Sequence, residues 1–385
     1  MHQILQQDLQ NIFTGLTAKE LLSGKKIFIT GFAGSLGYMM MQFFAHYGSK
    51  LGIHHVYALD NYVFGKPDWV SALEGNPLFT IKMGDVITED FAFARDAQLI
   101  FHMASLASPV YYRLHPIETM DADVIGLRRL LEFYEHKDIF NLLFYSTSEI
   151  YGDPNIVPTP EKYWGNVNTS GPRACYDESK RYAETLCYNF HHRRGFPVTV
   201  IRPFNSYGPG LRINDKRAPA DFAMNVINNE DIVLYSGGKS TRTFCYSSDI
   251  TLASLKCILH GKYDIFNAGS DRDEITIHQL AEIYKSIGQE LFGYSGEIIF
   301  KQHEDKHYNT DDPKRRCPDL TKIKSILGYT PSVEVGDGVR RYLRFLYAET
   351  STKNNSEVSA SAQPQGSCKS NFLLQHGITL RGVAK

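Results

Sequence analysis

The segment KIFITGFAGSLGYMMMQFFAHY, residues 26–47, decides the fold. An apolar run at 26–30 leads into a glycine-rich turn and then into an apolar stretch long enough for a helix. Gly31, Gly34 and Gly37 have the spacing GxxGxxG. Such glycines let the backbone turn tightly and approach a pyrophosphate, whose charge is met by the N–H groups at the start of the helix. The segment therefore predicts a strand, a phosphate-binding loop and a helix.

The alternation of strand and helix continues on the C-terminal side of this segment. Further short apolar runs are expected to form buried strands, at 56–60, 78–82, 99–103, 142–146 and 198–202. Helical stretches separate most of them, as a parallel sheet covered on both faces requires. The expected fold class is α/β: a doubly wound parallel sheet of the Rossmann type, followed by a smaller mixed α/β lobe.

This pattern divides the chain into four regions. Residues 1–24 have apolar positions at helical spacing and are expected to form an N-terminal helical extension. Residues 25–203 are expected to form the Rossmann domain. Residues 204–350 mainly form the smaller lobe, with some segments returning to the Rossmann domain. Residues 351–385 begin with a polar stretch of low complexity and are expected to be a flexible tail.

The composition argues against several classes of protein. The 385 residues carry a formal net charge of −1, so no basic field favours nucleic acid. No apolar run approaches the roughly 18 residues that span a bilayer. The six cysteines are scattered without CxxC spacing, which indicates reduced thiols rather than disulfides or zinc ligands. We therefore expect a cytoplasmic protein with no metal site, no nucleic-acid partner and no membrane partner.

Asp60 ends the second expected strand, 23 residues after Gly37. A carboxylate in this position accepts hydrogen bonds from the adenosine ribose hydroxyls and repels a 2′-phosphate, so we expect the cofactor to be NAD rather than NADP. Further cofactor contacts are expected from the glycine loop and from the ends of neighbouring strands, namely Phe32, Ala33, Leu36, Asn61, Asp85, Val86, Met103 and Ala104.

Tyr176 and Lys180 lie four residues apart on a helix expected at 173–193, so both point from one face. A tyrosine is a poor base at neutral pH, but a nearby ammonium and the positive nicotinamide both favour the phenolate. Thr147, in the STSE segment after the fifth expected strand, offers a hydroxyl that can share the proton that Tyr176 accepts. These residues predict an acid–base site in contact with NAD.

The motifs TGFAGSLG, STSE and YDESK, in this order, resemble those of the extended short-chain dehydrogenases/reductases that act on nucleotide sugars. Within this family the chain most resembles the UDP-glucuronic acid decarboxylases. The resemblance covers residues 25–348. The segments that carry it are DNYVFGK (60–66), STSEIYGDP (146–154), YWGNVNTSGPRACYDESKRYAETL (163–186), RPFNSYGP (202–209), STRTFCYSSDI (240–250) and DDPKRRCPDL (311–320).

The resemblance implies an enzyme that converts UDP-glucuronate to UDP-xylose or its 4-keto form, with NAD tightly bound and recycled. Tyr176 takes the O4 proton while C4 is oxidised, and the carboxyl group, then β to a ketone, leaves as carbon dioxide. Ser148 stands where related 4,6-dehydratases carry an aspartic acid. Because a serine does not donate a proton near neutral pH, Ser148 favours decarboxylation.

The resemblance also assigns roles around the sugar and the nucleotide. Glu149 is expected near C5, where it places a proton or orders a water. Arg316, and not its neighbour Arg315, is expected close to the sugar carboxylate. The residues implied for the nucleotide half are Asn205, Arg217, Leu234 and Arg242. The resemblance further implies a homodimer formed through helices at 117–136 and 173–193.

The segment HPIETMDADVIG, residues 115–126, departs from the family pattern. Glu118 and Asp121 stand at two lysine positions, and Asp123 stands at the usual asparagine. Negative charge is unfavourable beside an anionic sugar if these side chains face it. A 4-epimerase or 4,6-dehydratase that uses the same bound NAD therefore stays open as an alternative. A redox-sensing binding protein is a further alternative, although such proteins commonly lose the catalytic tyrosine or lysine.

Overall fold

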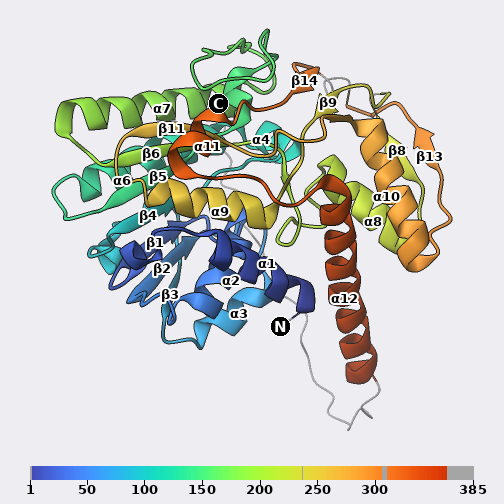
Figure 1. Cartoon of the computed structure of the whole chain (residues 1–385), viewed down its shortest axis with the longest axis horizontal. Helices are drawn as coiled ribbons and strands as arrows, with labels where there is room; N and C mark the ends of the chain where they lie inside the picture. Colours follow the sequence, from blue (N-terminus) through green and yellow to red (C-terminus); the bar gives the residue numbers. More distant parts are fainter. Residues whose placement is uncertain (1, 236, 306–309, 362–385) are drawn as a thin grey trace, which may run out of the picture. The chain divides into compact units, whose positions relative to one another are not determined.

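A parallel sheet of seven strands forms the centre of the computed structural model (Figure 1). The structure describes residues 2–235, 237–305 and 310–361, without the side chains of 352–361. The strand order is β11–β6–β5–β4–β1–β2–β3. The strands are β1 (Lys26–Thr30), β2 (His55–Asp60), β3 (Phe79–Met83), β4 (Leu99–His102), β5 (Asn141–Tyr145), β6 (Val198–Pro203) and β11 (Asp264–Ala268). The predicted α/β fold with a parallel central sheet is confirmed.

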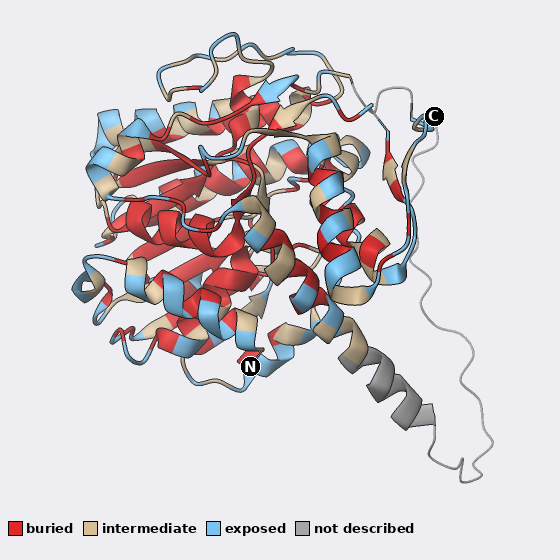
Figure 2. Ribbon diagram, turned by 45° about the vertical axis from the view of Figure 1, so that its right-hand side comes forward, coloured by how far each residue is buried: buried red, intermediate tan, exposed pale blue. Residues whose placement is uncertain are grey.

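Alternate residues of the central strands point into two separate hydrophobic cores. In β1, Ile27 and Ile29 belong to one core and Phe28 to the other. The first core is completed by helices α1 (Gln3–Gly15), α2 (Ser35–Tyr47), α3 (Asp68–Glu74) and α9 (Ser247–Ile258). The second core is completed by α6 (Leu127–Tyr134) and α7 (Ala174–Arg194). Buried residues accordingly concentrate in the sheet and on the helix faces that cover it (Figure 2).

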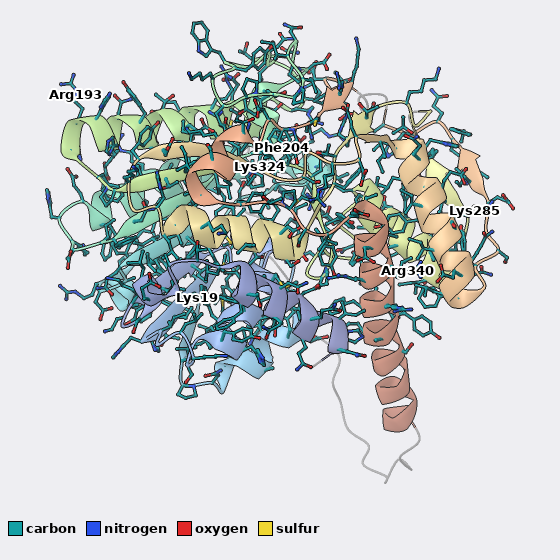
Figure 3. The ribbon with its side chains drawn as sticks, viewed as in Figure 1. Lys19, Arg193, Phe204, Lys285, Lys324 and Arg340 are labelled. Carbon is teal, nitrogen blue, oxygen red and sulfur yellow. The ribbon has the colours of Figure 1, made fainter. Side chains whose placement is uncertain are left out.

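The seventh strand comes from the second half of the chain. β11 pairs in parallel with β6, with Ile265 opposite Val200. Helix α9 also packs on the sheet, so residues on both sides of position 203 build the same layer. Phe204, at the junction, lies inside the molecule, whereas Arg193 projects from the end of α7 (Figure 3).

The rest of the second half forms short strands and helices. β8 pairs with β13, β10 pairs with β7, and β9 lies between β12 and β14. The elements are β7 (Ser206–Tyr207), α8 (Ala218–Asn228), β8 (Ile232–Leu234), β9 (Thr241–Arg242), β10 (Cys245–Tyr246), β12 (Ile275–Thr276), α10 (Ile277–Phe292), β13 (Ile298–Phe300), β14 (Arg315–Arg316) and α11 (Thr321–Leu327).

Shorter helices complete the first half of the chain. The helix expected at 117–136 contains a π-helical turn, η3 (Ala122–Gly126), between α5 (Pro116–Asp121) and α6. Single π turns inside helices are rare and are frequent at functional sites. The remaining short elements are η1 (Lys19–Leu22), η2 (Ala92–Ala94), α4 (Pro109–Leu114) and η4 (Ser148–Tyr151).

The C-terminal helix is longer than expected. The sequence predicts a helix at 335–348 and a flexible tail from 351, but α12 (Val335–Ser361) continues to Ser361. No glycine or proline interrupts the chain between Gly338 and Pro364, and each residue added to an existing helix gains a backbone hydrogen bond at little cost. The rest of the expected tail, 362–385, lies outside the described residues.

The chain divides into two units, Met1–Tyr347 and Ala348–Lys385. Within the described ranges, none of the helices combines the length and the apolar character needed to cross a membrane.

Candidate active site

The glycine loop joins β1 to α2 at the carboxyl edge of the sheet. Gly31 has φ +73°, and a Cβ there would lie 2.5 Å from the backbone nitrogen of Ala104. A Cβ on Gly37 would lie 2.1 Å from the carbonyl oxygen of Phe32. Gly34 caps α2 without a side-chain hydrogen bond, which leaves the start of the helix open to an anion. The loop therefore fits the pyrophosphate of a dinucleotide.

Asp60, at the end of β2, lies directly against this loop. Its Oδ2 accepts a hydrogen bond from the Ala33 backbone N–H at 2.9 Å, and its Oδ1 accepts one from the Tyr62 N–H at 2.8 Å. Burial raises the pKa of Asp60, and these two N–H groups oppose the rise. A carboxylate fixed beside the loop is the arrangement that an adenosine ribose requires.

The other predicted cofactor residues surround the same edge. Met103 and Ala104 follow β4, and the Met103 N–H donates to the Thr30 carbonyl at 3.0 Å. The Asn61 side chain donates to the Asp85 carboxylate at 3.0 Å.

The remaining predicted cofactor residues differ in exposure. Leu36 is partly buried, and Val86 is buried. The Phe32 side chain is fully buried against Tyr62 and Trp69, so only the backbone of Phe32 is available to a cofactor.

Tyr176 and Lys180 lie one turn apart on α7, as their spacing predicts. The Lys180 Nζ donates to the Tyr145 carbonyl at the end of β5 at 2.9 Å, and it lies 5.8 Å from the Tyr176 ring centroid. Burial and the negative charge of Asp123 raise the pKa of Tyr176, while a hydrogen bond to the Thr147 side chain lowers it. The phenol is therefore the stable form before a cofactor binds.

Asp123 is the departure from the family pattern that reaches this site. It is fully buried, and its Oδ1 lies 2.9 Å from the Lys180 Nζ. Glu118 is exposed and Asp121 is partly exposed. Of the three acidic residues, Asp123 is thus the one that touches the predicted acid–base pair.

The turn that follows β5 carries a carboxylate between two arginines. Thr147 caps η4 by accepting a hydrogen bond from the Glu149 N–H at 3.2 Å, and Ser148 is buried. The Glu149 carboxylate forms ion pairs with Arg173 and with Arg316, the latter at 2.6 Å. Burial alone would raise the pKa of Glu149, but Arg173, Arg316 and Arg242 outweigh burial and lower it. Glu149 is therefore ionised.

Sheet register places a third arginine next to Arg316. Arg242 on β9 is the direct partner of Arg316 on β14, and it forms an ion pair with Asp312 at 3.0 Å. The Arg316 guanidinium also donates to the Asn205 side-chain oxygen at 3.3 Å. Residues from four distant segments of the chain thus meet around Glu149.

Two predicted substrate residues are not joined to this cluster by a contact. Arg217 forms a two-pronged ion pair with Asp215, with one nitrogen–oxygen distance of 2.9 Å. Leu234 is buried at the end of β8, where its carbonyl accepts a hydrogen bond from the Lys301 N–H at 3.0 Å.

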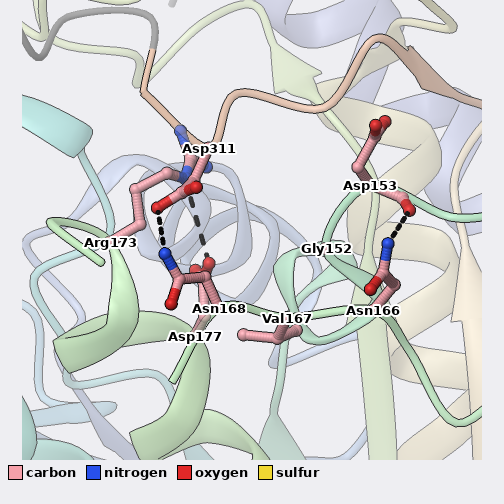
Figure 4. A pocket seen from close by; sticks show the side chains of 8 residues that line it. All are labelled: Gly152, Asp153, Asn166, Val167, Asn168, Arg173, Asp177 and Asp311. Carbon is pink, nitrogen blue, oxygen red and sulfur yellow. Dashed lines mark hydrogen bonds and ion pairs between the residues drawn. The ribbon is translucent and has the colours of Figure 1, made fainter. Parts of the chain in front are cut away.

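A cavity of about 260 Å³ lies beside the arginine cluster (Figure 4). Arg173 and Asp177, from the start of α7, form one part of its wall. Burial, followed by the charge of Glu149, raises the pKa of Asp177 and favours its neutral form. The other lining residues are Gly152, Asp153, Asn166, Val167, Asn168 and Asp311.

Four residues of the site were missed by the sequence analysis: Tyr112, Arg173, Asp177 and Asp312. Arg173 and Asp177 flank Tyr176 within GPRACYDESK, so their proximity to it was a readable signal. The Tyr112 ring stacks on the Tyr176 ring, with centroids 5.0 Å apart, but it comes from another helix and no local pattern marks it. Within the described part of the chain, no group of three or more His, Cys, Asp or Glu residues is arranged to hold a metal ion.

Comparison with known proteins agrees with this geometry. Residues 27–269 match the model of the NAD dependent epimerase/dehydratase family. The chain belongs to this family. It is 34% identical to UDP-glucuronic acid decarboxylase 1 of Xenopus tropicalis over 369 residues, covering 94% of this chain and 83% of that relative. It is 36% identical to UDP-glucuronic acid decarboxylase 5 of Arabidopsis thaliana over 320 residues, covering 82% of this chain and 88% of that relative.

A solved structure of the family shares the fold. This is the UDP-glucuronic acid 4-epimerase from Bacillus cereus, solved in complex with UDP-glucuronic acid and NAD. The TM-score is 0.72 at 21% identity, over 84% of this chain and 99% of that one.

Gly37→Ala tests the cofactor loop. A Cβ at this position collides with the Phe32 carbonyl, so we expect weaker NAD binding and a free energy of unfolding lowered by about 1–3 kcal/mol. NAD binding is measured by calorimetry and unfolding by urea titration. Gly75→Ala is the matched control, because Gly75 has a negative φ and a Cβ added there would meet no atom within 4 Å. NAD binding by Gly37→Ala at wild-type affinity would show that the loop does not hold the cofactor.

Proposed function

We propose that this protein is an NAD-dependent nucleotide-sugar decarboxylase, which converts UDP-glucuronate to UDP-xylose or its 4-keto form. The observation that carries the proposal is the cluster of Arg173, Arg242 and Arg316 around Glu149, next to Thr147 and Tyr176. The names of the relatives in frog and plant support it.

The charge balance of this cluster favours an anionic ligand. The three guanidinium groups pair with Glu149 and Asp312; a third carboxyl group, that of Asp177, lies 3.9 Å from Arg173, and burial and the charge of Glu149 raise its pKa. Burial is the first cause, and the charge of Arg316 the second cause, of the lowering of the pKa of Arg242 to about 10. A sugar carboxylate that enters the cluster finds several guanidinium donors close together.

In the proposed reaction, the glycine loop and Asp60 hold NAD, and Tyr176 accepts the proton of the sugar O4. The cofactor, when bound, supplies a hydride acceptor for C4. Lys180 stabilises the developing phenolate, and the Thr147 hydroxyl orients it. Once C4 is a ketone, the carboxyl group on C5 is β to a carbonyl. The C5–C6 bond breaks, carbon dioxide leaves, and the electron pair is delocalised onto the ketone oxygen as an enolate.

Glu149 is suited to the step that follows. It is ionised while Arg173 and Arg316 are both paired with it. A substrate carboxylate that draws Arg316 away removes part of this stabilisation and raises the pKa of Glu149. Glu149 then either takes up a proton from water and passes it to C5 of the enolate, or orders a water that protonates C5 and gives up hydroxide to solvent. Ser148 beside it offers no acid of the strength needed to expel a C6 hydroxyl, which disfavours a 4,6-dehydratase.

Incubation with UDP-glucuronate tests the function directly. We expect the release of carbon dioxide, measured by gas detection, and the formation of a pentose nucleotide, measured by mass spectrometry. Tyr176→Phe should lower turnover by about 10²- to 10⁴-fold, because the proton acceptor is lost, while NAD stays bound. Unchanged substrate in the presence of bound NAD would refute the proposal. An isomer of equal mass would indicate the 4-epimerase alternative, and a product that keeps C6 but lacks its oxygen would indicate a dehydratase.

Arg316→Gln tests the carboxylate site. Loss of a charge-assisted hydrogen bond is expected to lower kcat/KM for UDP-glucuronate by about 10- to 100-fold, with the Kd for UDP unchanged. Arg315→Gln is the matched control, since Arg315 is half-exposed and pairs with Glu274 on the surface. Equal kcat/KM values for the two variants would place the sugar carboxylate elsewhere.

We also propose a homodimer formed through α5, η3, α6 and α7, and a cytoplasmic location. These helices expose several large apolar side chains, as expected for a surface that a second copy covers. The exposed residues are Ile117, Met120, Ile125, Tyr182 and Tyr188. Support for a reducing compartment comes from the five cysteines among the described residues, all of them free thiols.

Ile117→Glu tests the dimer. Ile117 is 64% exposed on α5, and a charge there should convert the dimer to a monomer at micromolar concentration, as measured by light scattering. Ile326→Glu, on the exposed face of α11, is the control and should leave the dimer intact. A monomeric wild-type protein would refute the dimer.

A further inference from the structure

The ammonium of Lys180 is held by a carboxylate that the family pattern does not include. The Lys180 side chain is 3% exposed and Asp123 is 0% exposed, and their charged atoms lie 2.9 Å apart. The Tyr145 carbonyl accepts a second contact from the same Nζ at 2.9 Å. The sheet and the π turn thus clamp the ammonium from two sides.

Asp123 is itself fixed by two consecutive residues of α7. Its Oδ1 faces Lys180, and its Oδ2 accepts a hydrogen bond from the Ser179 hydroxyl at 2.8 Å. The residue lies within η3, the π-helical turn Ala122–Gly126, and not in the regular helix on either side. The carboxylate therefore has a defined position relative to the Tyr176–Lys180 pair.

A paired ammonium supports a phenolate less than an unpaired one. The negative charge of Asp123 offsets much of the field that Lys180 exerts on Tyr176, and it also acts on Tyr176 directly. In line with this geometry, burial is the first cause and Asp123 the second cause of the raised pKa of Tyr176. A neutral side chain at position 123 would remove this opposition.

Other titratable or charged groups lie around Tyr176 and Lys180 on the elements packed against them. Those acting on Tyr176 or Lys180 are His102 on β4, Tyr112 on α4, Glu149 on η4, Asp177 and Cys187 on α7, and Arg217 at the start of α8. All of them are common to the wild-type protein and a position-123 variant. A comparison of the two therefore isolates the contribution of Asp123.

We propose that Asp123 is a positioning residue that holds Lys180 and sets the pH range in which Tyr176 accepts a proton, shifting it to higher pH than a neutral residue would. The proposal rests on the roles proposed above for Tyr176 and Lys180. It explains how a buried acidic residue at this place is compatible with turnover of an anionic sugar: its charge is directed at Lys180 and matched by it.

The test compares Asp123→Asn with Glu118→Gln, which removes a negative charge from an exposed position five residues earlier in the chain. We expect the acidic limb of the kcat profile to move down by about one pH unit in Asp123→Asn and to stay in place in Glu118→Gln. A readout independent of turnover is the ultraviolet titration of phenolate, with the Tyr176→Phe version of each protein subtracted. It should show the same downward shift in the pKa of Tyr176.

The possible outcomes are distinct. This inference is overturned if, in Asp123→Asn, neither the acidic limb of the kcat profile nor the ultraviolet titration of Tyr176 shifts. If Tyr176→Phe is inactive in the same experiment, the proposed function still stands. An active Tyr176→Phe would instead overturn the proposed function. If Asp123→Asn does not fold, Asp123→Ser, which also removes the charge, takes its place, and an acidic limb that stays at its wild-type position in this variant would overturn the inference.

Discussion

The arrangement of the site depends on one buried cation, the ammonium of Lys180. It joins α7 to the end of β5 through the Tyr145 carbonyl, and it joins α7 to the π turn through Asp123. The Nζ also lies 5.1 Å from the centroid of the Phe144 ring. A charge in the protein interior is tolerated only with such partners. Because Tyr176 lies one turn earlier on the same helix, its position relative to the glycine loop follows from where Lys180 is held.

The same requirement for compensated charge shapes the opposite side of the site. Glu149 is stabilised by Arg173 and Arg316, and Asp312 lies close to both Arg173 and Arg242. In this network each of the three arginines is paired with a carboxylate. In the proposed function, substrate binding is an exchange of partners at Arg316, which would link recognition of a carboxylate to the proton affinity of Glu149.

Elements whose structure depends on residues close together in the chain could be predicted from the sequence. Six of the seven central strands lie within one residue of their predicted bounds, β11 being the one that was not predicted, and Tyr176 and Lys180 share one face of α7. What could not be predicted depends on long-range contacts. The register of β9 with β14 brings Arg242 to Arg316, and the π turn aims Asp123 at a lysine 57 residues later. The end of α12 was misjudged because a polar sequence without glycine or proline carries no stop signal.

In the proposed reaction, C4 of the sugar is oxidised before the carboxyl group leaves. It is tested most directly by competition between UDP-glucuronate carrying deuterium at C4 and the unlabelled compound. We expect the unreacted substrate to become enriched in deuterium as carbon dioxide is released, because the C4–hydrogen bond must break on the way to the product. An unchanged isotope ratio at high conversion, with carbon dioxide still released, would contradict it.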